Sequence, residues 1–359
     1  MERQVGYWHL LTNGRIQCDL CPRHCQMNDG QDGLCVVRGR QGDTLVLRGY
    51  GQASSLCIDP IEKKPLYHFM PGEAILSLGT VGCNLTCKFC QNWSITKSER
   101  GSSLLDRLGE TAMPEQIAAA AASVHCPMVA VTYNEPVVFL EYAVDVAQAC
   151  HQRGIRTVAV TAGYIDAAPR EELFRHIDAV NIDLKAFDER FYRSLVGGHL
   201  QPVLETLVYV HQETDTWLEV TTLLIPGEND SDHELHALTG WVFEHLGPDV
   251  PLHFSAFHPD WQLRDRPHTT AATLLRARKV AQANGLHHVY CGNVQEESGS
   301  HTWCHHCGTR LIARIGWQIA DWNLTSEGHC RHCGSRCNGV FAGPHGRWGA
   351  RRLPIRIRA

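Results

Sequence analysis

Three cysteines lie close together in residues 82–93, in the order Cys83, Cys87 and Cys90. They follow the apolar run 74–79, which predicts a short buried strand. Three thiolates on one loop can ligate three irons of a cubane iron–sulfur cluster. Because the loop has no fourth cysteine, one iron is left for an outside ligand, whereas a zinc site or a ferredoxin cluster needs a fourth ligand. The spacing therefore favours a [4Fe–4S] cluster with one open coordination position over a zinc loop.

A second group of cysteines lies near the N-terminus. Its members are Cys18, Cys21, Cys25 and Cys35. A Cys-x-x-Cys pair forms a turn that fits a tetrahedral metal, and the other two cysteines can complete the set. A structural zinc knuckle, an auxiliary cluster and a thiol site all remain open for this group.

A third group forms two Cys-x-x-Cys pairs, Cys304 with Cys307 and Cys330 with Cys333. A glycine follows each pair and permits the tight turn whose backbone N–H groups face the thiolates. The two pairs predict a zinc-ribbon or rubredoxin-like module. Structural zinc is favoured over an electron-relay iron.

Several other residues near the metal-binding patterns are expected to have ordinary roles. Four thiolates already satisfy zinc, so the neighbouring histidines are expected to be exposed: His305, His306 and His332. Cys337 is either an idle thiol or a competitor for the metal. Cys126 and Cys150 are expected to be small buried hydrophobic residues.

The composition is that of a globular protein with a large core. The chain has 359 residues, 43% of them hydrophobic, and a net charge of -5, which does not indicate a nucleic-acid-binding protein. The 16 cysteines and the absence of a signal-peptide pattern at the N-terminus point to metal and redox chemistry in a reducing cytoplasm. No apolar run approaches the roughly 18 residues of a membrane span.

The middle of the chain alternates between apolar, β-rich runs and helical stretches. The runs that predict strands are 74–79, 128–133, 157–161, 179–184, 217–225 and 252–257. The stretches that predict helices are 114–123, 137–152, 171–176, 189–195, 231–246 and 270–283. Continuous apolar strands between helices indicate a parallel sheet covered by helices. The six units predict an α/β fold, an open, partial (β/α)6 TIM-like barrel, with catalytic groups at the carboxyl ends of its strands.

Polar residues follow the later predicted strands at the ends where chemistry is expected. These ends are Asn134–Glu135, Thr161–Tyr164, Asp183–Lys185, Gly227–Asp230 and His258–Asp260. All five should converge near the cysteine loop. Asp183 and Lys185 are two residues apart on an extended segment, so their side chains should point the same way.

The cysteine spacing, with Phe89 just before the last cysteine, resembles the radical S-adenosylmethionine (SAM) superfamily. Residues 72–300 are similar to the branch that contains pyruvate formate-lyase activating enzyme, since Cys-x-Phe-Cys-Gln-Asn, Asn-Glu-Pro, Asp-Leu-Lys and Pro-Gly-x-Asn occur in the expected order. The whole chain, with its Cys-Pro-Arg-x-Cys segment and the motif at 59–69, resembles the radical enzyme of the AmmeMemoRadiSam system. The resemblance implies the radical SAM fold.

By position, the resemblance also implies roles for single residues. Cys83, Cys87 and Cys90 would bind the cluster, at whose open iron SAM is cleaved. The residues that would contact or position SAM are Phe89, Asn134, Glu135, Asp183, Lys185 and His258.

The sequence differs from the activating enzymes at two places that affect the implied cofactor contacts. Residues 160–163 read Val-Thr-Ala-Gly where the activating enzyme has Asp-Thr-Asn-Gly, so its monovalent-cation site loses a carboxylate. Thr221 stands where that enzyme has an arginine, so another group must hold the methionyl carboxylate. A monovalent cation remains an open expectation.

The sequence divides into four parts. They are a cysteine-rich segment with a linker (1–71), the partial barrel (72–300), the four-cysteine module (301–345) and a basic tail (346–359). Residues 59–69 contain two prolines and several charges, and we expect an ordinary solvated connector there, although it could pass the active site. Docking of the tail on the chain itself, or a frayed end, is favoured over RNA contact.

The expected function is that of a radical SAM enzyme of oxidoreductase type that abstracts a hydrogen atom from a small-molecule or protein substrate. It would need an electron donor and act with Memo-like and Amme-type proteins. One alternative is a glycyl radical enzyme activase. A third hypothesis, of another class, is a zinc-binding scaffold that contacts RNA.

Overall fold

The structure is a computed structural model that describes residues 1–97, 106, 108–341 and 343–357. Its centre is a curved sheet in the strand order β14-β13-β12-β11-β10-β9-β8-β7-β18. Strands β8 to β14 pair in parallel with their neighbours, and β7 and β18 join antiparallel at one edge. The two ends of this order, β14 and β18, do not pair within the described chain, so the barrel is open. The α/β fold with a parallel sheet is confirmed.

Each predicted strand forms, with bounds close to those expected. The parallel strands are β8 (Ala74–Gly79), β9 (Met128–Val131), β10 (Arg156–Thr161), β11 (Ala179–Asp183), β12 (Trp217–Leu224), β13 (Leu252–Ala256) and β14 (Val289–Gly292). The prediction of six strands was short by β14, a run of only four residues. The antiparallel β7 (Ser55–Pro60) was also missed.

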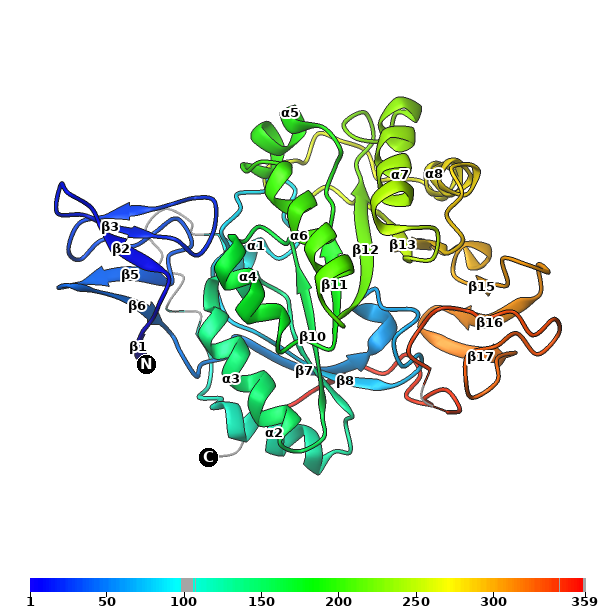
Figure 1. The fold of residues 1–359 in the computed structure, drawn as a ribbon, viewed down its shortest axis with the longest axis horizontal. Coiled ribbons are helices and arrows are strands. Elements are labelled where there is room, and N and C mark those ends of the chain that lie inside the picture. The colour runs from blue at the N-terminus through cyan, green and yellow to red at the C-terminus, as the bar shows by residue number, and fades with distance from the viewer. Residues whose placement is uncertain (98–105, 107, 342, 358–359) are drawn as a thin grey trace.

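Helices cover the outer face of the sheet (Figure 1). They are α2 (Pro114–Ser123), α3 (Leu140–His151), α4 (Ala167–Phe174), α5 (Glu189–Phe191), α6 (Gln201–Glu213), α7 (Asp232–Leu246) and α8 (Ala271–Ala283). The short helix α1 (Trp93–Thr96) instead directly follows the cysteine loop after β8. The short turns of 3-10 or π type are η1 (Ile61–Lys63), η3 (Pro136–Phe139), η4 (Tyr192–Val196) and η5 (Glu297–Gly299).

The helix predictions held where the sequence carries a clear start signal. Ser231 and Thr270 cap α7 and α8 by accepting bonds from backbone N–H groups, and Pro114 opens α2. Helix α6 was missed, although Val203, Leu207 and Val210 form its buried face at helical spacing.

Small sheets lie at the two ends of the long axis (Figure 1). The N-terminal sheets contain β1 (Glu2–Gln4), β2 (Trp8–Leu10), β3 (Ile16–Cys18), β4 (Gln26–Met27), β5 (Arg38–Gln41) and β6 (Thr44–Arg48). The C-terminal module contains β15 (Thr302–Trp303), β16 (Arg310–Ile315) and β17 (Gln318–Trp322).

Residues 59–69 correct the expectation of a solvated connector. The segment passes inside the protein, and even its charged members Asp59, Glu62 and Lys64 are buried. We call it the buried strap. The charges led to the wrong expectation, because nothing in the local sequence shows that the backbone of this segment bonds to Glu219 on the distant strand β12.

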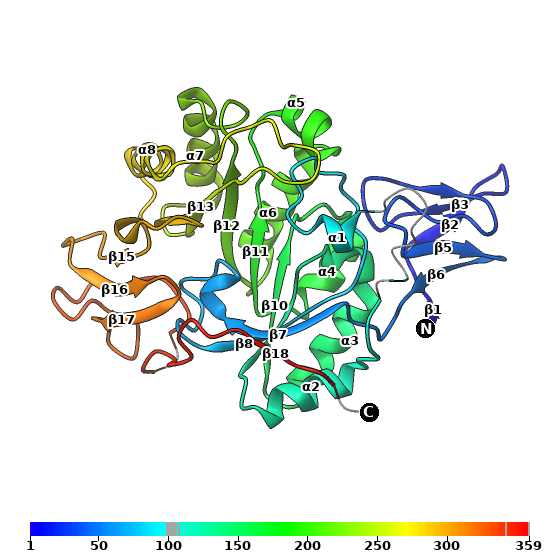
Figure 2. The same cartoon turned by 180° about the vertical axis from the view of Figure 1, so that it is seen from behind.

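The C-terminal tail docks on the chain itself. Strand β18 (Leu353–Pro354) pairs antiparallel with β7, and the red tail runs along it in Figure 2. Arg352 lies 3.9 Å from Asp59. No helix in the described ranges has the length and apolar character needed to cross a membrane.

Candidate active site and metal centres

The cysteine loop leaves β8 and is held by backbone contacts on both sides. Gly82 has a φ of +86°, and a Cβ there would lie 2.2 Å from the Cys35 carbonyl oxygen, so only glycine fits. The N–H groups of Thr86 and Lys88 donate to the backbone of the η4 segment at 3.0 and 2.8 Å. The loop is therefore fixed before any ligand binds.

Asn134 clamps the start of this loop. Its Oδ1 accepts from the Thr80 N–H at 2.9 Å, and its Nδ2 donates to the carbonyl oxygens of Val81 and Gly82. These bonds give the Asn134 side chain a structural task that the sequence prediction, which gave it a SAM contact, did not include.

A cavity of about 1240 Å³ lies beside the loop. Most of the predicted site residues border it: Cys83, Cys87, Phe89, Cys90, Asn134, Glu135, Asp183 and Lys185. The structure thus brings together side chains that follow β8, β9 and β11, at the carboxyl edge of the sheet. Their roles toward a cluster and SAM stay predictions.

Glu135 is a buried carboxylate held by three donors. It accepts from the Thr161 hydroxyl at 2.5 Å, from the Ala162 N–H at 2.8 Å and from the Val137 N–H at 3.3 Å. Burial raises the pKa of Glu135, and the three donors oppose that rise. The site therefore fixes one acidic group in a defined orientation.

Asp183 and Lys185 form an ion pair at the cavity. Lys185 Nζ donates to Asp183 Oδ2 at 2.9 Å, as their spacing on an extended segment predicts. Burial lowers the pKa of Lys185, but Asp183 and Cys87 outweigh it and hold that pKa well above its usual value. Asn229 supports the pair by donating to the Lys185 carbonyl oxygen at 2.8 Å.

Some predicted residues lie away from the cavity. Of the described side chains that line it, none comes from 226–230 or 258–260. His258 is exposed, with its ring 6.4 Å from that of His268. Asp260 does not line the cavity, and it accepts a hydrogen bond from Trp93 Nε1, at the end of the cysteine loop, at 2.9 Å. Three of the five strand ends therefore meet at the cavity.

The buried strap supplies cavity residues that the sequence prediction missed. Lys64 donates to Asp59 at 2.9 Å and lies over the Tyr133 ring, whose hydroxyl also donates to Asp59 at 2.9 Å. Burial raises the pKa of Glu62, which lines the same cavity, to about 7. The repeated charges in this motif were the available signal, but they were interpreted as solvated.

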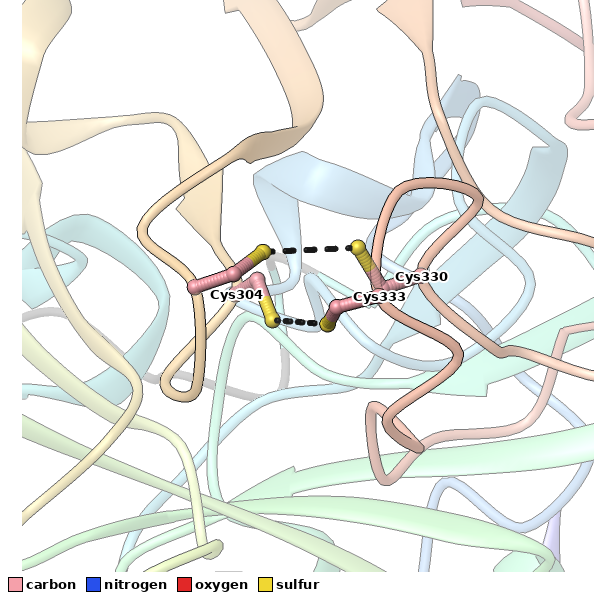
Figure 3. A group of neighbouring side chains, drawn as sticks. Cys304, Cys330 and Cys333 are labelled. Atoms are coloured by element: carbon pink, nitrogen blue, oxygen red, sulfur yellow. Dashed lines mark hydrogen bonds between the residues drawn. The ribbon is translucent and has the colours of Figure 1, made fainter.

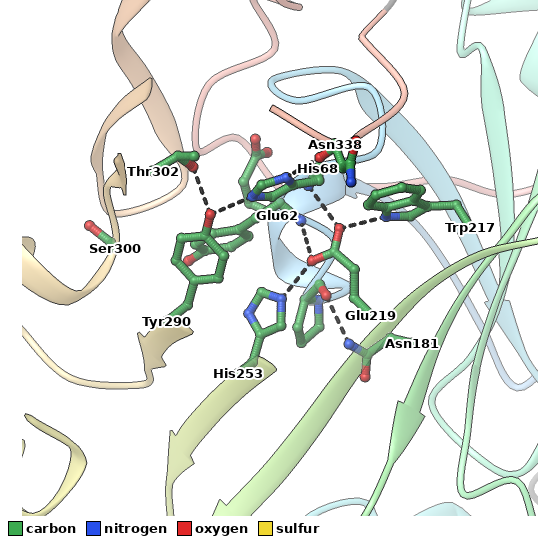
Figure 4. A network of polar contacts seen from close by, with 12 residues as sticks. Glu62, His68, Asn181, Trp217, Glu219, His253, Tyr290, Ser300, Thr302 and Asn338 are labelled. Atoms are coloured by element: carbon green, nitrogen blue, oxygen red, sulfur yellow. Dashed lines mark hydrogen bonds and ion pairs between the residues drawn. The ribbon is translucent and has the colours of Figure 1, made fainter. Parts of the chain in front are cut away.

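A carboxylate on β12 fastens the strap to the barrel interior (Figure 4). Glu219 accepts from the backbone N–H groups of Tyr67 and His68 at 2.9 and 2.8 Å and from Trp217 Nε1 at 3.0 Å. Its fourth partner is His253 Nε2 at 2.6 Å, and His253 lines the cavity.

The C-terminal cysteines form a compact group of four thiols (Figure 3). The Sγ atoms of Cys304 and Cys333 lie 3.7 Å apart, and those of Cys307 and Cys330 lie 3.8 Å apart. Tetrahedral zinc with Zn–S bonds of about 2.3 Å requires sulfurs about 3.8 Å apart. The group therefore fits a single tetrahedral metal ion.

The neighbours of this group lie as expected. The adjacent histidines are exposed, namely His305, His306 and His332. Cys337 is buried outside the group, 3.9 Å from His68 Nδ1. Cys126 and Cys150 are buried.

Comparisons with known proteins identify relatives of this chain. The radical SAM superfamily model matches residues 77–239. An uncharacterized protein of Methanocaldococcus jannaschii is 38% identical over 341 residues, which is 94% of this chain and 100% of that protein. Pyruvate formate-lyase 1-activating enzyme of Escherichia coli is 25% identical over 162 residues, 44% of this chain and 63% of the enzyme.

Among solved structures, a radical SAM methyltransferase from Sphaerobacter thermophilus matches with a TM-score of 0.48 and 15% identity, over 81% of this chain and 76% of that one. The match to the Methanocaldococcus protein spans the whole of that protein, and the radical SAM model matches the part that contains the cysteine loop. The chain therefore belongs to one family with that archaeal protein, and its residues 77–239 form a radical SAM domain.

Proposed function

We propose that this protein uses a [4Fe–4S] cluster on Cys83, Cys87 and Cys90 to cleave SAM reductively and to abstract a hydrogen atom from a substrate in the adjoining cavity. The observation that carries the proposal is the joint lining of one cavity by the three cysteines, Glu135 and the Asp183–Lys185 pair. Radical SAM membership and similarity to activating enzymes support it.

The thiols of the loop fit a cubane cluster better than a single metal ion. In the described chain, the groups of ligand atoms that lie within 4.8 Å of one another do not include Cys83, Cys87 and Cys90 together. In a cubane each thiolate bonds to a different iron, so the sulfurs stand farther apart than around zinc. When bound with SAM, such a cluster supplies one electron that breaks the sulfonium C–S bond, giving methionine and a 5'-deoxyadenosyl radical.

The residues of the chain orient and enclose the reactants. Glu135, as an acceptor with a fixed geometry, suits the methionyl amine of SAM. Asp183 and Lys185 offer one acceptor and one donor to the same ligand. Ile315, Trp317 and Arg352, from the C-terminal module and tail, contribute to the cavity wall, which helps to keep water from a radical.

The test is anaerobic reconstitution followed by assay of 5'-deoxyadenosine with SAM and a one-electron reductant. Wild type should form it, and Cys87→Ala should fall to background. Cys150→Ala removes a buried thiol on α3 far from the loop in sequence and should retain wild-type formation. Equal product from wild type and Cys87→Ala would contradict the proposal.

For the substrate, we favour a small molecule or protein modified together with Memo-like and Amme-type partners over a glycyl radical enzyme. The added cysteine modules support this choice, because the activating enzyme matches only 44% of this chain. Transfer of deuterium from a labelled glycyl-radical peptide into deoxyadenosine would instead establish the activase alternative.

We further propose zinc at Cys304, Cys307, Cys330 and Cys333, because their spacing suits one tetrahedral ion. Metal analysis should give about one zinc per chain in addition to iron and sulfide. Zinc without any iron or sulfide in anaerobically purified protein, together with RNA binding, would support the scaffold hypothesis. One iron without zinc would support an electron relay.

A further inference from the structure

The four N-terminal cysteines surround a second, much smaller cavity. Cys18, Cys21, Cys25 and Cys35 line a space of about 20 Å³ between their unligated side chains. They come from the end of β3 and from the two loops around β4. The topology of the N-terminal sheets thus joins cysteines up to 17 positions apart around one point.

These thiols are free, and a backbone N–H group faces the sulfur of Cys25. None of the cysteines in the described chain forms a disulfide. The Leu34 N–H donates to Cys25 Sγ at 3.5 Å. Such bonds stabilise thiolates that hold a metal cluster.

A buried cation at the cavity lacks part of its hydrogen-bonding complement. Arg38 lines the cavity and is 1% exposed. Its Nε donates to the Val138 carbonyl oxygen at 3.1 Å and its Nη2 to Glu141, but its Nη1 has no partner among the described atoms. An unsatisfied buried charged donor is costly, so an anionic occupant of the cavity would relieve it.

The spacing of the sulfurs distinguishes this group from the C-terminal one. The four C-terminal ligand atoms lie within 4.8 Å of one another, as around a single ion, whereas no such compact group includes the four N-terminal cysteines in the ranges described. They share this wider spacing with Cys83, Cys87 and Cys90. Wider spacing is what a cubane requires, because its four thiolates bond to four different irons.

The small cavity is packed against the loop that carries Cys83. Arg23 Nε donates to the Asn84 carbonyl oxygen at 2.7 Å, and Asn84 itself lines the small cavity. The Cys35 carbonyl oxygen lies so close to Gly82 that a Cβ there would be 2.2 Å away. A cluster at this point would therefore lie next to the first one.

We propose that Cys18, Cys21, Cys25 and Cys35 hold a second [4Fe–4S] cluster that passes electrons to the cluster on the Cys83 loop. With four protein ligands it has no open iron, which leaves electron transfer as its task. It accepts one electron from a one-electron donor protein or reductant and passes that electron on, so no bond forms or breaks there. The relay role rests on the proposed function, but the presence of the cluster does not.

The test compares full-length variants after anaerobic reconstitution, by iron, acid-labile sulfide and electron paramagnetic resonance of the reduced protein. The variant Cys83→Ala/Cys87→Ala/Cys90→Ala should keep about four irons and four sulfides, half the wild-type sulfide. Its signal should not change when SAM is added. Adding Cys18→Ala and Cys21→Ala should remove the remaining sulfide, whereas adding Cys126→Ala and Cys150→Ala as a matched control should not.

Sulfide is the deciding quantity because the C-terminal thiols can hold one iron but no sulfide. A folded triple variant without sulfide, or with zinc in its place, would overturn the second cluster. If the triple variant does not fold, the wild type decides: about eight sulfides support the proposal and about four overturn it.

The outcome is separable from that of the proposed function. If the wild type cleaves SAM but contains only about four sulfides, the second cluster is contradicted and the proposed function stands. If the triple variant contains sulfide but the wild type forms no deoxyadenosine, the second cluster is supported and the proposed function is contradicted. For the relay role, Cys18→Ala/Cys21→Ala should slow reduction of the first cluster, and an unchanged reduction rate would overturn that role.

Discussion

At the scale of single residues, Asn134 and Glu135 are adjacent just after the end of β9 but have different roles. The Asn134 side-chain amide forms hydrogen bonds with the backbone of residues 80–82, and these bonds set the position of the cysteine loop. Glu135 takes its bonds from the next strand end, through Thr161 and Ala162, and borders the cavity. One side chain shapes the loop, and the other presents charge to a ligand.

Replacing Glu135 by Gln should weaken both stability and SAM binding. The amide cannot accept from all three donors, which costs about 1–3 kcal/mol for a buried unsatisfied group. The negative charge that would face the methionyl amine is also lost. Urea unfolding and equilibrium dialysis of SAM with the reconstituted protein measure the two effects.

Thr161→Val is the control for this substitution, because it removes one donor to Glu135 and keeps the carboxylate. It should leave SAM binding closer to wild type than Glu135→Gln does. Equal SAM affinity in wild type and Glu135→Gln would show that this carboxylate does not contact the cofactor.

At the scale of elements, the buried strap and β12 depend on each other through Glu219. The carboxylate is 0% exposed and joins two strap N–H groups, an indole and an imidazole. The strap in turn brings Glu62 and Lys64 to the cavity. A structural carboxylate thus determines which polar groups a substrate meets.

Glu219→Gln should reduce the free energy of unfolding by about 1–3 kcal/mol, because one oxygen that accepts hydrogen bonds becomes an amide that cannot. Glu205→Gln, the same substitution at an exposed position on α6, should stay within about 0.5 kcal/mol of wild type. Denaturant unfolding of wild type, Glu219→Gln and Glu205→Gln measures these free energies of unfolding. Similar losses in both variants would mean that the Glu219 network contributes nothing specific.

At the scale of the whole molecule, the barrel lies between two cysteine-containing modules and is joined to the C-terminal one by the buried His68. His68 Nδ1 donates to the Asn338 carbonyl oxygen at 2.6 Å, and its Nε2 accepts from the Tyr290 hydroxyl at 2.5 Å. Burial lowers the pKa of His68 to about 3 and lowers that of His288 as well. Both rings therefore stay neutral in the folded protein.

This junction should make the protein sensitive to mild acid. The folded pKa of His68 lies below the unfolded value of about 6.5, so its contribution to stability is present above pH 6.5 and is lost as the pH falls. At pH 5.5 the loss from this one residue is about 1.4 kcal/mol. Urea unfolding at pH 7.5 and 5.5 measures it.

His68→Gln isolates this contribution, because glutamine can supply a donor and an acceptor but does not titrate. The variant should lose less stability than wild type between the two pH values. The same loss in both proteins would assign the acid sensitivity to other groups.

Local spacing in the sequence was sufficient to predict several parts of this protein. The apolar run 74–79 predicted strand β8, and the role of the three cysteines after it toward a cluster stays a prediction. The two Cys-x-x-Cys pairs predicted a four-thiol group, which the structure contains. Strand, turn and ligand spacing are encoded within a few residues, so no distant contact is needed to infer them.

Contacts between distant residues decided the rest. The strap is buried because Glu219, 151 positions from His68, accepts its backbone N–H groups, and no local pattern in 59–69 predicts that. Arg352 reaches the barrel because β18 pairs with an otherwise open sheet edge. The sequence by itself determined that the two Cys-x-x-Cys pairs can hold metal, since their ligand spacing is a property of near neighbours in the chain. Only the tertiary structure decided which charges face the cavity and which thiols share one space, because burial and proximity depend on how the whole chain packs.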